Sequence, residues 1–87
     1  MLERLLVVKG TFPSRGGVEV LPAVASDRVP ATPFDVTVRT PDGAERRAKA
    51  TVIVAHIRGP LPPMAMVRLA DLTVDAVPPG TELWVER

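Results

Sequence analysis

The chain has 87 residues and a formal net charge of +1, and 46% of its residues are hydrophobic. This length fits one domain spanning residues 1–87, and the near-neutral charge argues against a strongly electrostatic partner. The chain has no cysteine, no secretory signal and no apolar run of about 20 residues, so we expect a soluble, cytoplasmic protein without disulfides or thiolate metal sites.

The composition also favours strands. Most of the apolar residues are Val, Ala and Leu, of which Val prefers strands. Ten prolines divide the chain into short segments, as in small all-β barrels. Arg outnumbers Lys, and Asn and Gln are absent, which together with abundant Ala, Val, Pro and Gly indicates a GC-rich bacterial genome.

The first predicted element is a strand that begins with the apolar run from Leu5 to Val8. Strand alternation places Leu6, Val8 and Phe12 on one face, and we expect Phe12 to belong to the core. Gly10 lies inside this segment, where a glycine usually marks a bulge or a sharp bend.

A hairpin turn follows this strand. Pro13 removes a backbone donor, so pairing should end near it. The Ser-Arg-Gly-Gly sequence at residues 14–17 tolerates positive φ and predicts a hairpin loop longer than two residues. The second strand of the hairpin, residues 18–21, should end at Pro22.

Two stretches of the chain resemble a known family. The passage from Phe12 through Arg15-Gly16-Gly17 into Val18-Glu19-Val20 is similar to the opening of the second-domain barrel of elongation factor Tu. The tail from Val74 to Val85 looks like the ending of small stand-alone bacterial relatives of that barrel. The resemblance implies an all-β fold, a closed small barrel of about six strands. The phosphate loop G-x-x-x-x-G-K-[ST] is absent and no tRNA-contacting side chain of the family matches a position here, so those functions do not carry over.

The middle of the chain predicts a loop and then a second hairpin. Residues 23–33 show no alternation and indicate a loop across the end of the barrel. Residues 34–40 alternate well, with Phe34, Val36 and Val38 facing inward. Pro41-Asp42-Gly43 then predicts a tight turn followed by a bulge, because Gly43 can supply the positive φ.

The return strand should run from about Glu45 to Ile57. One of its faces would carry Ala48, Ala50, Val52 and Val54. Its apolar end, residues 52–57, is expected to be buried on both sides or nearly so. The proline-rich residues 59–63 should stop this strand.

The segment from Met64 to Leu72 fits either a short helix or a strand. We choose the strand, because Pro63 precedes it, its neighbours are strands and the resembling family has a strand here. The Val-Pro-Pro-Gly sequence at residues 77–80 predicts a turn, and residues 81–85 predict the last strand.

Catalysis and metal binding find little support in the sequence. The single histidine, His56, lies at an apolar strand end, and Ser14 and Ser26 lie in predicted loops instead of a strained nucleophile turn. One histidine cannot form a usual zinc site, and Asp71 and Asp75 lack the spacing of a calcium loop. We therefore expect no catalytic residue, no metal and no cofactor.

Basic side chains around the second turn are candidates for nucleic-acid binding: Arg15, Arg39, Arg46, Arg47 and Lys49. A hairpin would gather the last four at one end of the barrel, where Arg15 could join them. Small barrels do bind oligonucleotides, but such sites normally add stacking aromatics, and here Asp42 and Glu45 partly neutralise the patch. A solvated hairpin of mixed charge is the interpretation that we favour.

Trp84 is the candidate for protein interaction. If Leu83 and Val85 face the core, Trp84 faces outward, and an outward tryptophan is common at interfaces. Packing on residues 77–79 or on the N-terminus is an equal alternative. We expect a non-enzymatic binding or accessory module with an unidentified protein partner, and RNA or single-stranded nucleic acid is the alternative partner. The sequence does not predict the oligomeric state.

Overall fold

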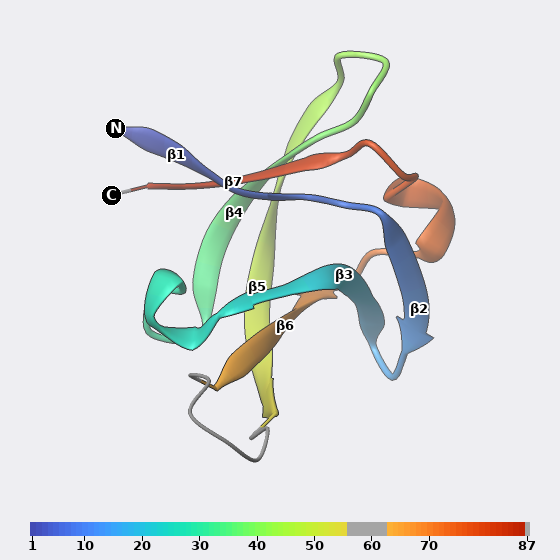
Figure 1. Ribbon diagram of the computed structural model, residues 1–87. Coiled ribbons are helices and arrows are strands. Elements are labelled where there is room, and N and C mark those ends of the chain that lie inside the picture. The colour runs from blue at the N-terminus through green and yellow to red at the C-terminus, as the bar shows by residue number, and fades with distance from the viewer. Residues whose placement is uncertain (56–62, 87) are drawn as a thin grey trace.

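The computed structural model describes residues 1–55 and 63–86 of the chain (Figure 1). The described part contains seven strands and two short 3-10 helices: β1 (Leu2–Val7), β2 (Gly10–Ser14), β3 (Gly17–Ala25), η1 (Ser26–Arg28), β4 (Phe34–Arg39), β5 (Glu45–Ala55), β6 (Met64–Ala70), η2 (Val74–Ala76) and β7 (Glu82–Glu86). The strands form one antiparallel sheet in the order β1-β7-β4-β5-β6-β3-β2. The all-β prediction is confirmed, and β6 shows that the ambiguous segment is a strand.

The sheet curls into a half-barrel and does not close on itself (Figure 1). β1 and β2 occupy its two edges although they follow each other in the chain. Between them the chain bends sharply: the Val8 amide donates to the Thr81 carbonyl (2.7 Å), and the Lys9 amide donates to the Leu21 carbonyl (2.8 Å). No described ladder joins β1 to β2, so the two edges stay unpaired with each other. The predicted closed barrel of about six strands is therefore wrong. The bend expected at Gly10 lies just before that residue.

One face of the sheet carries the core. Its buried apolar side chains come from every strand except β2, and they include Leu5, Leu6, Val18, Val20, Val24, Phe34, Val36, Val38, Ala50, Ala65, Val67, Leu69, Leu83 and Val85. In β6 every second residue is buried, as expected for a strand with one face on the core. The inward positions predicted for β4 and β7 are confirmed.

Phe12 does not belong to the core, contrary to the prediction, because its side chain is 51% exposed. It pairs with Glu19 on β3, whose neighbours Val18 and Val20 are buried. Residues directly opposite each other in an antiparallel pair point to the same face of the sheet. Phe12 therefore shares the outer face with Glu19.

Two further expectations about burial need correction. In β1 a register shift buries both Leu5 and Leu6, although simple alternation places them on opposite faces. In β5, Ile53 and Val54 are 49% and 44% exposed, although this end of the strand was expected to be buried. The described ladder between β4 and β5 ends at Ala50, so β4 does not cover the residues that follow.

The first hairpin is tighter than predicted. Ser14 pairs with Gly17, so the loop consists of Arg15 and Gly16 alone, with Gly16 at a φ of 76°. Gly17 lies against β6, where an added β-carbon would sit 2.0 Å from the Leu69 carbonyl oxygen. The close approach of β3 to β6 thus requires a residue without a side chain at this position.

Strand β3 continues through Pro22 to Ala25, although Pro22 was expected to end it. The pairing between β3 and β6 shifts register between Val20 and Val24. The missing amide of Pro22 therefore falls in an irregular part of the ladder, where it breaks no regular pair. The loop predicted for residues 23–33 is correspondingly shorter and begins with η1.

The second hairpin has the predicted turn and bulge. The Gly43 amide donates to the Thr40 carbonyl (2.9 Å), the Thr40 amide donates to the Ala44 carbonyl (2.9 Å), and Gly43 has a φ of 92°. The Asp42 carboxylate accepts hydrogen bonds from the Thr40 hydroxyl and from the Ala44 amide. These two bonds, the first above all, hold the pKa of Asp42 below its usual value.

The last predicted turn is also present. The Thr81 amide donates to the Pro78 carbonyl (3.1 Å), and Gly80 has a φ of 94°. This turn leads from η2 into β7, which confirms the predicted final strand.

Three predictions concern residues outside the described part of the chain: the strand end at Ile57, the stop at residues 59–62, and the place of His56. Within the described part, no helix has the length and apolar character needed to cross a membrane.

Candidate functional site

Trp84 lies on the outer face of the sheet, as predicted, because Leu83 and Val85 on either side of it are buried. Its indole Nε1 donates to a carboxylate oxygen of Glu82 (3.0 Å), and the Arg39 guanidinium lies 5.4 Å from the ring centroid. A guanidinium over an aromatic face is attracted by the ring electrons. Trp84 is therefore held in orientation by its neighbours while its side chain is only half-buried.

Arg39 is also the centre of an ion-pair network. Its guanidinium pairs with Glu45 (2.6 Å) and approaches Glu82 (4.0 Å), and Arg4 reaches the same Glu82 carboxylate (3.5 Å). These groups are partly exposed, so each pair contributes little to the free energy of unfolding. The network nevertheless neutralises Arg39, which leaves its charge less available to a phosphate.

The basic residues proposed for nucleic-acid binding do not form one patch. Strand alternation places Arg39, Arg47 and Lys49 on the outer face. Arg46 pairs with Val38, whose side chain is buried, so Arg46 belongs to the opposite face. The predicted cluster around the second turn is therefore divided between two faces of the sheet.

Arg15 lies further away still. It belongs to the turn between β2 and β3, which is well separated from the turn between β4 and β5 (Figure 1).

Lys49, on the outer face, forms an ion pair with Asp35 (2.8 Å). Of the outer-face cations named above, Arg47 is the one that makes no ion pair with a described residue.

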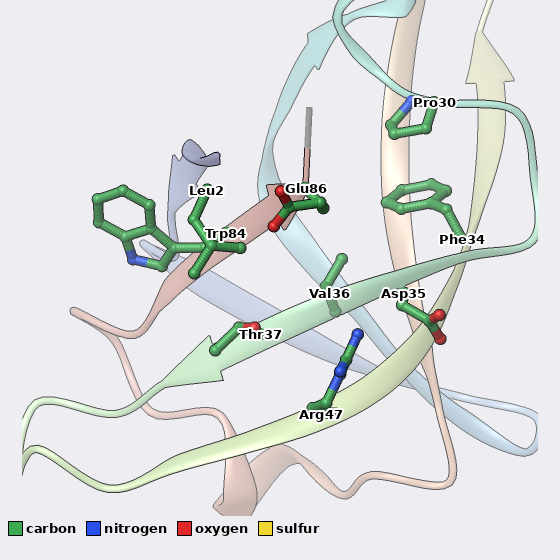
Figure 2. Close-up of a pocket in the computed structure, with 9 residues that line it drawn as sticks. All are labelled: Leu2, Pro30, Phe34, Asp35, Val36, Thr37, Arg47, Trp84 and Glu86. Carbon is green, nitrogen blue, oxygen red and sulfur yellow. The ribbon is translucent and has the colours of Figure 1, made fainter.

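A groove opens where β4 and β7 stop pairing. Residues 37–39 pair with residues 82–84 of β7. In the described ladders, residues 34–36 pair with β5 alone, and Val85 and Glu86 pair with β1 alone. The unpaired ends of the two strands border a groove of about 500 Å³ (Figure 2).

Apolar side chains form much of the groove wall: Leu2, Pro30, Phe34 and Trp84. Figure 2 shows Pro30 and Phe34 on one side and Leu2 and Trp84 on the other. Phe34 is largely buried beneath the surface, whereas Leu2 is 47% exposed. The groove thus combines an apolar lining with access from solvent.

Three charged residues also line the groove, and two of them have partners. Asp35 accepts a hydrogen bond from Lys49, which together with the charge of Lys49 holds the pKa of Asp35 below its usual value of 3.8. Glu86 pairs with the N-terminal ammonium of Met1. Arg47 contributes a smaller part of the lowered pKa of Asp35, but it forms no ion pair with any described residue. Its guanidinium is therefore the charged group of the groove that is left without an ion-pair partner among the described residues.

The sequence identified Trp84 and Arg47 separately and did not indicate that they share a groove. Leu2, Pro30 and Asp35 were not singled out at all. The groove depends on where β4 and β7 stop pairing. These strands are far apart in the sequence, so no local sequence pattern predicts the residue at which their pairing ends. By contrast, strand alternation from Arg46 through Ala48 to Ala50 predicts that Arg46 lies on the same face as these two alanines.

Among the residues that the structure describes, no group of three or more His, Asp or Glu side chains is placed to hold a metal ion. Comparisons with protein-family models, with curated proteins and with solved structures found no match to this chain. The groove between β4 and β7 is therefore the feature from which we infer function.

Proposed function

We propose that the chain is a non-enzymatic protein-binding module and that the groove between β4 and β7 is its contact surface. Trp84 carries this proposal, because it is an outward, half-buried indole on the wall of an apolar-lined groove. Tryptophan offers a large contact area at a small entropy cost and is enriched among residues that dominate binding energy. Leu2 extends the exposed apolar area beside it.

RNA or single-stranded nucleic acid is the second candidate partner. It is supported by one observation, the presence of Arg47 and Trp84 in the same groove, since such sites combine cations with stacking aromatics. It is the weaker candidate because Arg39 and Lys49 are held in ion pairs and Arg46 lies on the other face. A phosphate backbone would find few free cations here.

We also propose that the chain is a relative of the second-domain barrel of elongation factor Tu. Support comes from the hairpin of β2 and β3, in which Arg15-Gly16-Gly17 leads into a Val-rich strand of a curled all-β sheet. The proposed relationship concerns the fold and carries no nucleotide or tRNA function to this chain.

Affinity capture from a bacterial lysate tests the proposed surface. The native chain and the Arg46→Ala variant should retain the same protein partner at about 50 mM and at about 500 mM salt, because an apolar contact is weakly screened. Trp84→Ala should lose that partner while keeping a native circular dichroism spectrum. A partner that Trp84→Ala retains in full would contradict the proposal, and Arg47-dependent capture of RNA at low salt alone would favour the second candidate.

A further inference from the structure

The groove has a strand edge in its wall. Residues 34–36 pair with β5 on one side and with no described strand on the other. In an antiparallel ladder, successive residues direct their amide and carbonyl groups to alternate neighbours. At least one of these three residues therefore presents both groups to the groove. A free strand edge is a template on which another extended chain can pair.

The side chains beside this edge suit an extended segment. Phe34 lies at the edge itself, and Leu2 and Trp84 face it across the groove (Figure 2). Successive side chains of an extended peptide point to opposite sides. A peptide paired with residues 34–36 can therefore place alternate side chains against the apolar wall while its main chain bonds to β4.

The charge of the groove specifies the polar part of the peptide. Arg47 pairs with Thr37 across β4 and β5, next to the free edge, and it has no ion-pair partner among the described residues. Asp35 and Glu86, the acidic residues of the groove, already have cationic partners. A guanidinium binds a carboxylate through two parallel hydrogen bonds, so an acidic ligand complements this site.

We propose that the partner binds as a short extended peptide that pairs with residues 34–36 of β4, with a carboxylate on Arg47 and an apolar side chain on Trp84. This inference rests on the proposed protein-binding function and names the class of partner. Main-chain hydrogen bonds supply affinity in this mode of recognition, and the alternating side chains supply specificity.

A display library of random peptides of about eight residues, long enough to cross the free edge, is the probe for side-chain recognition. Enriched peptides should carry Asp or Glu two positions from an apolar or aromatic residue, because Arg47 and Trp84 lie on the same face of the sheet. Arg47→Ala should raise their dissociation constant about tenfold. Arg46→Ala is the matched control, because it removes the adjacent arginine on the opposite face and should leave binding unchanged. Arg47→Glu should turn the selection towards peptides with Lys or Arg, and enrichment of the same peptides by all variants would overturn the carboxylate contact.

Backbone methylation of the best selected peptide tests the main-chain pairing. Methylation of one amide nitrogen at a time removes one donor without changing a side chain. Methylation at alternate positions should weaken binding by about tenfold or more, and the positions between them should tolerate it. Equal tolerance at every position would overturn pairing with β4.

The outcomes separate this inference from the proposed function. Peptides that depend on Trp84 but neither on Arg47 nor on their own amides would leave the protein-binding function standing and overturn the inference. If the library yields no enriched peptide, the inference is overturned. If the chain then also binds single-stranded RNA with a steep salt dependence, the proposed function is overturned with it.

Discussion

The two halves of β4 are held in different ways. Residues 37–39 pair with β5 on one side and with β7 on the other, and Val38 between them is fully buried. Residues 34–36 have the same alternation but pair with β5 alone, and their other edge borders the groove. The difference comes from the path of β7 and not from the sequence of β4. Both halves of the strand thus supply buried side chains to the core, but only residues 34–36 leave a main-chain edge beside the groove.

Two arginines of this hairpin show a second contrast. Arg39, in the doubly paired half, lies over Trp84 and pairs with Glu45. Arg47, opposite Thr37 on β5, lines the groove and forms no ion pair with a described residue. Both are exposed basic residues on one face of one hairpin. Arg39 is held in an ion pair, whereas the guanidinium of Arg47 is available to bind an anion. The contacts of an arginine, and not the number of arginines, decide whether a basic hairpin can bind an anion.

Leu83→Asp should have the largest effect on the doubly paired half. Leu83 is fully buried and pairs with Val38, so the variant places an unpaired carboxylate in the core. A domain of this size has a free energy of unfolding of roughly 5–10 kcal/mol, and we expect the variant to be unfolded by circular dichroism. Thr51→Asp, at an exposed position of β5, is the control and should stay folded. A folded Leu83→Asp with a cooperative thermal transition would contradict this description of the core.

Gly43→Val should have a moderate effect at the turn that follows the doubly paired half. Gly43 has a positive φ, which strains a β-branched residue by about 1–2 kcal/mol, and urea unfolding should show this loss. Apart from Gly43 and its two chain neighbours, no described residue has a heavy atom within 4 Å of an added β-carbon, so the cost is conformational and not steric. Gly43→Asn, which tolerates positive φ, should therefore lose much less. An equal loss in both variants would remove the conformational explanation.

Trp84→Ala should separate stability from binding. The variant loses the cation–π contact and part of its apolar burial, so we expect the free energy of unfolding to fall by about 1 kcal/mol. Binding of the selected peptides should be lost at the same time, whereas Trp84→Phe should keep most of both. A loss of stability of about 3 kcal/mol or more would identify Trp84 as a core residue instead of a contact residue.

Acid should have the smallest effect, and it reports on both ends of β4. The pKa values of Asp35 and Asp42 are lowered, the first by Lys49 and the second by Thr40. A lowered pKa in the folded state means that the stabilisation is complete above the usual value of 3.8 and is lost as the pH falls through the folded pKa. Lys49→Ala should raise the pKa of Asp35 and leave that of Asp42 unchanged, as measured by NMR titration of the carboxyl carbons. A titration of Asp35 at or above its usual value in the native chain would contradict the ion pair.

Local patterns predicted the local features of this fold. The alternation of β4, the turn at Pro41-Asp42-Gly43 and the inward Leu83 all follow from nearest-neighbour chemistry. The open edge between β1 and β2 and the outward position of Phe12 depend on which distant strands pair and in which register. The groove has the same origin, so the sequence indicated Trp84 and Arg47 but neither the other residues of the groove nor their assembly.

Amide hydrogen exchange along β4, followed by NMR in the absence of any ligand, tests the central claim most directly. If residues 34–36 have a free edge, at least one of their amides should exchange at least about a hundredfold faster than the amides of residues 37–39, which are held between two ladders. A selected peptide should then slow that exposed amide specifically. Uniformly slow exchange along all six residues of β4 would show that the edge is already paired, and the binding surface proposed for this protein would not exist.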